Sequence, residues 1–190
     1  MAVPPPTKAM LRQHLRKRRQ AYVSEQNFGA LKAATAALSR RVIEKFSSYQ
    51  IISAYLPIDN EIDTGKLLEA MTALDISMAL PHIEGRGGTL RFLRWRWGDP
   101  LGDGPFGLKQ PNVLAQQCVP DVILTPLLGF DRSLNRLGYG AGHYDRVFAE
   151  YPGARRIGLA WSMQECDSIP TDPWDIPLHA IATELEWITA

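Results

Sequence analysis

The chain has 190 residues, of which 45% are hydrophobic and 22% charged, and its formal net charge is +1. This composition is typical of a soluble globular protein, and the length favours a single domain over residues 1–190. No apolar run approaches the ~20 residues of a membrane span, and the first ten residues lack the apolar core of a secretory signal. Two cysteines without Cys-x-x-Cys spacing indicate neither a disulfide framework nor a zinc site. We therefore expect a cytoplasmic protein.

The first third of the chain is predicted to be helical. Prolines at 4–6 indicate a flexible lead-in over residues 1–6, and Thr7 is a suitable N-cap. Apolar residues at helical spacing predict one helix from Lys8 to about Tyr22 and a second from Ser24 to Phe46.

Short apolar runs then alternate with helical segments. Thr64 is a candidate N-cap for a third helix, and a short helix follows the glycines near residue 140. Strand–helix–strand recurrence predicts an α/β domain with a largely parallel sheet and helices on its faces. The predicted strands lie at 51–57, 76–81 and 89–97, at the start of 121–131, at 155–161 and within 179–189.

Charge is distributed unevenly along the chain. Residues 1–24 carry +6 without any acid, which leaves −5 for the remainder. Such a basic segment needs an anionic partner within the fold or outside it, although charge runs are also common on solvated helix faces. The basic residues are Lys8, Arg12, Arg16, Lys17, Arg18 and Arg19.

The stretch "RLGYGAGHYDR", residues 136–146, combines three glycines with charged side chains. Glycines let the backbone approach a phosphate closely, and the N-terminus of a following helix adds a favourable dipole. The flanking arginines can neutralise phosphate charge, and Asp145 offers a hard oxygen ligand for Mg²⁺. A tight turn without a ligand is the alternative, and the spacing alone does not decide between them.

The chain resembles the 5-formyltetrahydrofolate cyclo-ligase (5,10-methenyltetrahydrofolate synthetase) family. The segments "KAMLRQHLRKRR", "YLPIDNEIDT", "GPFGLKQP" and "TPLLGFDRSLNRLGYGAGHYDR" occur in the family's order and at its spacing. The resemblance extends from about Thr7 to Glu184, and the last segment is its most specific part.

The resemblance implies a three-layer α/β/α sandwich and an enzyme activity. The family cyclises 5-formyltetrahydrofolate to 5,10-methenyltetrahydrofolate with Mg²⁺ and ATP, by phosphorylation of the formyl oxygen and release of ADP and phosphate. We accordingly expect a reduced folate and ATP as small-molecule substrates and Mg²⁺ as the metal. We expect a monomer with neither a nucleic-acid nor a membrane partner.

The resemblance also assigns site residues. Lys8 and Arg12 would contact the nucleotide phosphates, and Lys8 and Arg136 would be catalytic. Mg²⁺ would be bound by Asp145 and Asp175, and the folate by Leu56, Glu61, Phe106 and Tyr139. The triphosphate would lie in a glycine loop made of Arg136, Leu137, Gly138, Tyr139, Gly140, Ala141, Gly142, His143 and Tyr144.

Four positions depart from the family pattern, one of which is Gln110, where the family often has a glutamate before the proline. Ala141 and His143 replace a glycine and an aromatic residue, and the alanine is tolerable if its φ is negative. His179 stands where a second metal carboxylate is expected, and imidazole is a poor ligand for so hard an ion. Either Asp175 serves alone or His179 takes no part in Mg²⁺ binding.

Several assignments have plainer alternatives. Glu61 could be a helix-start carboxylate, Tyr144 could stack on adenine or pack under the loop, and the other basic residues of the first helix are expected at the surface. Trp95, Trp97 and Trp161 are expected to pack rather than stack on folate. The whole chain could also be a folate- or nucleotide-binding module without catalysis. A nucleic-acid contact by the basic helix is disfavoured because aromatic–basic interleaving is lacking.

Overall fold

The structure is a computed structural model that describes residues 6–46, 48–85 and 88–190, and the side chain of Phe106 also lies outside the description. The predicted flexible lead-in therefore falls almost entirely outside the described residues. In the part of the chain that the structure describes, no helix is both long and apolar enough to cross a membrane.

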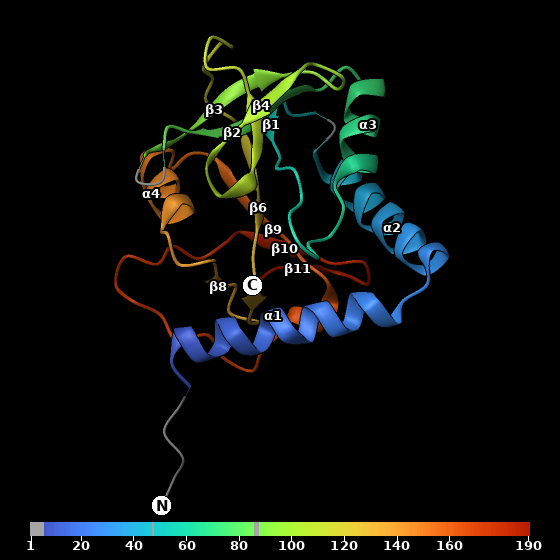
Figure 1. The fold of residues 1–190 in the computed structure, drawn as a ribbon, viewed down its shortest axis with the longest axis vertical. Coiled ribbons are helices and arrows are strands. Elements are labelled where there is room, and N and C mark those ends of the chain that lie inside the picture. Colours follow the sequence, from blue (N-terminus) through green and yellow to red (C-terminus); the bar gives the residue numbers. More distant parts are fainter. Residues whose placement is uncertain (1–5, 47, 86–87) are drawn as a thin grey trace, which may run out of the picture.

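A seven-stranded sheet, counted over the described residues, forms the centre of the protein (Figure 1). The strand order is β11-β10-β9-β6-β1-β2-β3; the pairs from β10 through β2 are parallel, and only the edge pairs β2–β3 and β10–β11 are antiparallel. The prediction of a largely parallel sheet is confirmed. The strands are β1 (Ile51–Ser53), β2 (Ser77–Ile83), β3 (Leu90–Trp95), β6 (Val122–Pro126), β9 (Arg155–Leu159), β10 (Ala180–Ala182) and β11 (Trp187–Ile188).

Alternate residues of the strands build a core on each face of the sheet, because successive side chains of a strand point to opposite sides. In β6, Val122 and Leu124 belong to the core beneath α2 (Phe28–Phe46) and α3 (Gly65–Ala73), whereas Ile123 belongs to the core beneath α4 (His143–Glu150). Figure 1 shows α2 and α3 on one side of the sheet and α4 on the other. The predicted three-layer α/β/α arrangement is therefore confirmed.

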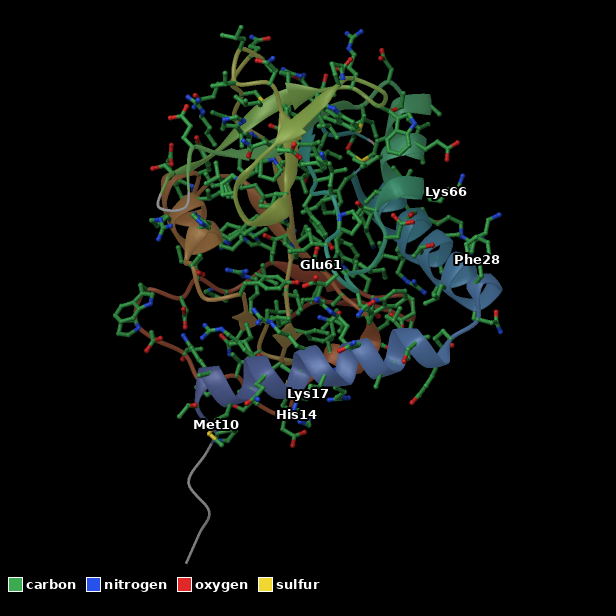
Figure 2. All side chains as sticks on the ribbon, viewed as in Figure 1. Met10, His14, Lys17, Phe28, Glu61 and Lys66 are labelled. Carbon is green, nitrogen blue, oxygen red and sulfur yellow. The ribbon has the colours of Figure 1, made fainter. Side chains whose placement is uncertain are left out.

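Helix α1 (Lys8–Glu25) lies across the end of the sheet rather than on a face (Figure 1). The Thr7 hydroxyl accepts a hydrogen bond from the backbone N–H of Met10 at 3.3 Å, as expected of an N-cap. On the inner side, Leu15 packs with Leu137 and Ile169 in a small core of its own. The outer side, with Met10, His14 and Lys17, is exposed (Figure 2).

The start of the second helix was predicted wrongly. Ser24 and Glu25 extend α1, and α2 begins only at Phe28. The side chain of Asn27 accepts a hydrogen bond from the backbone N–H of Ala30 at 2.9 Å and thereby caps α2. The cap residue, rather than the earlier serine, sets this boundary.

Two strand predictions also need correction. β1 ends at Ser53 instead of residue 57, and the segment after it leaves the sheet. The last strand, predicted within 179–189, is split into β10 and β11, which form an antiparallel pair. The turn is closed by the backbone N–H of Thr183, which donates to the carbonyl of Glu186 at 2.9 Å.

A short hairpin leads into the glycine loop. It consists of β7 (Gly129–Phe130) and β8 (Arg136–Leu137), and the carboxylate of Asp131 holds its turn. Asp131 is buried and accepts four hydrogen bonds of 2.9–3.0 Å, so the direction in which Arg136 leaves the turn is fixed locally. The donors are the backbone N–H groups of Ser133, Asn135 and Ile169 and the side-chain amide of Asn135.

The remaining elements are small. β4 (Leu101–Asp103) and β5 (Lys109–Pro111) form a two-stranded sheet around the 3₁₀ turn η1 (Pro105–Gly107). A second 3₁₀ turn, η2 (Ser162–Gln164), follows β9 and contacts α1.

Candidate active site

The carboxyl ends of β1 and β6 lie side by side where the chain order of the sheet reverses. β1 pairs with β2 on one edge and with the later strand β6 on the other. In open α/β sheets, ligands bind outside the carboxyl ends of strands at such a point. A cavity of about 650 Å³ opens there, lined among others by Tyr55 and Leu56 after β1, by Pro126 at the end of β6, and by the glycine loop.

The glycine loop contacts α1 directly. The Arg12 Nε donates a hydrogen bond to the carbonyl of Gly138 at 2.9 Å. Gly140 and Gly142 have φ values of 106° and 66°, a region that side chains disfavour. Ala141 is not among the residues with positive φ, so its methyl group is accommodated without backbone strain. The predicted meeting of the basic helix and the glycine loop is present.

Arg136 is a buried cation that lines the cavity. Its side chain is 6% exposed, and its Nη2 donates to Asp145 at 3.1 Å. Its guanidinium lies 5.5 Å from the ring centroid of Tyr144, which packs against Phe148 and also lines the cavity. The Nε of Arg136 is buried and has no hydrogen-bond partner in the part of the chain that the structure describes. Because an unsatisfied buried donor costs ~1–3 kcal/mol, this wall is suited to a further acceptor.

Lys8 joins α1 to the segment that precedes β10. Its ammonium group pairs with Asp172 at 2.6 Å and also with Asp175. Partial burial lowers the pKa of Lys8, but the hydrogen bonds and charges of the two carboxylates outweigh it, and the pKa lies above its usual value. Lys8 therefore stays charged beside the cavity.

A second polar cluster of the cavity surrounds Glu61. The hydroxyl of Tyr139 donates to one carboxylate oxygen of Glu61, and the backbone N–H of Ile58 donates to the other at 3.0 Å. Burial raises the pKa of Glu61 and outweighs the hydrogen bonds of Tyr139 and Ile58 and the charge of Arg19, so the pKa lies above its usual value. The hydrogen bonds describe an ionised carboxylate that accepts at both oxygens.

The structure brings the predicted site residues to one cavity with one exception. The side chain of Phe106 lies outside the described part of the chain, and its backbone belongs to η1. The remaining predicted residues all line the cavity; they are Lys8, Arg12, Leu56, Glu61, residues 136–145 and Asp175.

The prediction that Arg19 lies at the surface of α1 is wrong. Arg19 is 2% exposed and donates to the hydroxyl of Tyr139, whereas Lys17 and Arg18 are exposed as expected. Arg16 is exposed but also lines the cavity. The signal was available, since Arg19 follows the apolar Leu15 by four residues and shares its helix face.

Three further cavity residues had no role assigned from the sequence. Asp172 binds Lys8, Trp174 is 69% exposed at the cavity, and the buried hydroxyl of Tyr55 has no hydrogen-bond partner among the described residues. Trp95 and Trp161 pack in the core, as predicted.

His179 is turned away from the cavity lining. Its Nδ1 accepts a hydrogen bond from the backbone N–H of Arg156 at 3.0 Å, on the neighbouring strand β9. Burial and the charge of Arg156 lower the pKa of His179. Its ring thus supports the start of β9, an inner strand of the sheet, and His179 is not among the residues that line the cavity.

Fold and site together define an α/β/α protein whose ligand cavity, lined by cations and glycines, lies at the switch point of a parallel sheet. The sequence model of the 5-formyltetrahydrofolate cyclo-ligase family matches residues 5–184. The chain therefore belongs to this family.

Individual relatives agree with this assignment. A 5-formyltetrahydrofolate cyclo-ligase of Haemophilus influenzae is 34% identical over 68% of this chain and 73% of the relative. One from Mycolicibacterium smegmatis is 30% identical over 98% of both chains. The solved structure of Aquifex aeolicus 5,10-methenyltetrahydrofolate synthetase superposes with a TM-score of 0.79 at 26% identity, over 95% of this chain and 93% of that one.

Proposed function

We propose that this protein cyclises 5-formyltetrahydrofolate to 5,10-methenyltetrahydrofolate, with ATP and Mg²⁺, and releases ADP and phosphate. The observation that carries the proposal is the convergence of Lys8, Arg12 and Arg136 with the glycine loop on the cavity that also contains Glu61. One cavity thereby offers cations and backbone donors for a triphosphate together with a buried carboxylate for a heterocycle.

The nucleotide tail would occupy the part of the cavity between α1 and α4. Gly142 is the N-cap of α4, and the amide groups and dipole of a helix N-terminus favour phosphate. The unpartnered Nε of Arg136 would find an acceptor in a phosphate oxygen. These features support ATP as the co-substrate.

The carboxylates in the cavity suit Mg²⁺. Asp145 and Asp175 present hard oxygen ligands, while no preformed group of three metal-binding side chains occurs in the described ranges. Mg²⁺ is commonly held by one or two carboxylates and completed by substrate phosphates and water. Bound there, the ion would neutralise charge on the phosphates. The donor set therefore fits a metal that arrives with the nucleotide.

The folate would occupy the part of the cavity around Glu61. A carboxylate that accepts at both oxygens can pair with adjacent N–H groups of an aminopyrimidinone ring. The buried Tyr55 hydroxyl supplies one more unpartnered polar group, and Leu56, Ile83 and Leu90 supply apolar contact. A flat heterocycle with a polar edge matches this lining.

The proposed reaction has two steps. The formyl oxygen attacks the γ-phosphorus of ATP, and ADP leaves. The N10 nitrogen then attacks the activated formyl carbon, the N10 proton is lost, and phosphate departs with the former formyl oxygen. Positioning supplies most of the catalysis, because phosphoryl transfer needs little covalent help from the protein.

Absorbance tests the activity directly. Protein, 5-formyltetrahydrofolate and Mg·ATP should generate the near-ultraviolet band of the methenyl product. With ¹⁸O in the formyl group, the label should appear in the released phosphate. Folate binding without any product would instead indicate a binding module, and product with unlabelled phosphate would contradict the phosphorylation step.

A further inference from the structure

Arg19 is a buried cation that is linked to Glu61 through a single residue, Tyr139. It reaches inward from α1, and both of its terminal nitrogens donate to the hydroxyl of Tyr139 at 3.1 Å. One of them also lies 3.4 Å from the carbonyl of Leu127. The same hydroxyl is hydrogen-bonded to Glu61. Figure 2 shows Glu61 above α1, on the inner side of the helix.

The direction of these hydrogen bonds is fixed by chemistry. A guanidinium group only donates, whereas a phenol can accept at two lone pairs and donate its single proton. With two N–H groups of Arg19 on the oxygen of Tyr139, the phenolic proton is left to point at Glu61. The backbone N–H of Ile58 donates to the other oxygen, so Glu61 accepts a hydrogen bond at each of its two oxygens.

The groups around Glu61 shift its pKa in opposite directions. Burial disfavours its charge, and Asp59 on the same segment adds repulsion. Tyr55 after β1 and Tyr144 of α4 also face it, and their own pKa values are raised by burial and by the charge of Glu61. Arg19 lowers the pKa of Glu61 and contacts the hydroxyl of Tyr139. A second cation of α1, Arg16, lies 5.6 Å from the ring centroid of Tyr139 at the cavity.

We propose that Arg19 is a positioning residue for substrate binding, which acts through Tyr139 to hold Glu61 as an oriented, anionic acceptor for the N–H edge of the heterocycle. The inference rests on the proposed function only in taking a reduced folate as the ligand. Removing Arg19 frees the phenol to rotate and leaves a buried carboxylate without its counter-charge. Such a carboxyl group takes up a proton more readily and loses one acceptor.

The experiment measures the Kd of 5-formyltetrahydrofolate without ATP, by calorimetry between pH 5.5 and 8.5. The variants are Arg19→Met, Arg19→Lys, Tyr139→Phe and the double variant Arg19→Met/Tyr139→Phe. Lys17→Met is the matched control, because Lys17 lies on the exposed side of the same helix (Figure 2).

Arg19→Met should raise the Kd at neutral pH at least about tenfold, equivalent to ~1.4 kcal/mol. The acid-side loss of binding should move to higher pH, since Glu61 then protonates at higher pH. Arg19→Lys should restore part of the affinity, and the double variant should bind no more weakly than Tyr139→Phe alone, because both changes break one chain of contacts. Lys17→Met should match the wild type.

A Kd for Arg19→Met within twofold of the wild type and an unmoved pH midpoint would overturn the inference, as would fully additive effects in the double variant. Should Arg19→Met fail to fold, Arg19→Lys alone and combined with Tyr139→Phe gives the same comparison. Wild-type protein that binds no folate would contradict the proposed function itself. Wild-type binding with an unaffected Arg19 variant would contradict only the role of Arg19.

Discussion

Gly140 shows how a single position shapes the site. Its φ of 106° is a conformation that side chains rarely adopt, and a Cβ there would stand 3.4 Å from the guanidinium carbon of Arg12. The neighbouring Ala141 faces neither constraint, because it is exposed and has no positive φ. A side chain at position 140 would therefore strain the backbone, whereas the methyl group of Ala141 does not.

Gly140→Ala should weaken ADP binding at least about tenfold and destabilise the fold by ~1–2 kcal/mol, since the backbone must leave its left-handed conformation or push Arg12 aside. Ala141→Gly is the control and should leave both quantities nearly unchanged. ADP titration and denaturant unfolding measure the two effects. Equal behaviour of the two variants would contradict the strain argument.

Arg136→Ala should lower kcat/KM at least about 100-fold while the protein stays folded, because a preorganised donor to developing negative charge typically supplies that much. Arg132→Ala in the same hairpin is the control. Arg132 is exposed and, among the described residues, pairs with Glu165 and Glu186 at the surface, so its loss should change stability little and leave turnover unchanged. Normal turnover of a folded Arg136→Ala protein would remove Arg136 from the chemistry.

At the scale of elements, α1 and the segment before β10 approach each other across the cavity. Lys8 holds Asp172 and Asp175 of that segment, and Trp174 lies exposed between them. Under the proposed function, phosphates would compete for Lys8 and a metal for Asp175, so nucleotide binding would require these ion pairs to rearrange. We therefore expect nucleotide binding to change the environment of Trp174.

Mg·ADP should change the tryptophan fluorescence of the protein, and Trp174→Phe should remove most of that change. Trp97→Phe serves as the control, because Trp97 is also partly exposed but packs against Trp95 on β3. Titration of both variants with Mg·ADP distinguishes them. A full signal in Trp174→Phe would show that the segment does not respond to the nucleotide.

At the scale of the whole molecule, the cavity is assembled from α1, the ends of β1 and β6, the glycine loop and the segment before β10. These parts are far apart in sequence, and a ligand that contacts several of them is bound only by the folded chain. Ligand binding and folding are therefore thermodynamically linked.

Mg·ADP and 5-formyltetrahydrofolate should each raise the Tm, with ~2.7 kcal/mol of added stability at a concentration of 100 Kd. Arg136→Ala should lose most of the ADP shift and keep the folate shift, because Arg136 lies on the nucleotide side. Thermal unfolding followed by dye fluorescence measures both. Loss of the two shifts together would contradict separate nucleotide and folate regions.

Local patterns account for the correct part of the fold prediction. Thr7 and the apolar spacing of α1 identify that helix, and β-branched runs such as Val122–Pro126 identify buried strands, because both signals depend on neighbours within a few residues. The boundary at Asn27 was missed because several polar residues there can cap a helix. The split between β10 and β11 was missed because a short hairpin and one strand share the same alternation.

The sequence by itself determined the α/β class, the glycine loop and, through its resemblance, a set of residues that meet in one cavity. Only the tertiary structure decided that Arg19 is buried, that Asp172 shares Lys8 with Asp175, and that His179 supports β9. The reason is physical: helix periodicity and backbone freedom are set by nearby residues. Burial and charge pairing depend on segments more than 100 residues apart, such as α1 and the carboxyl end of β6, and arise only when the sheet assembles.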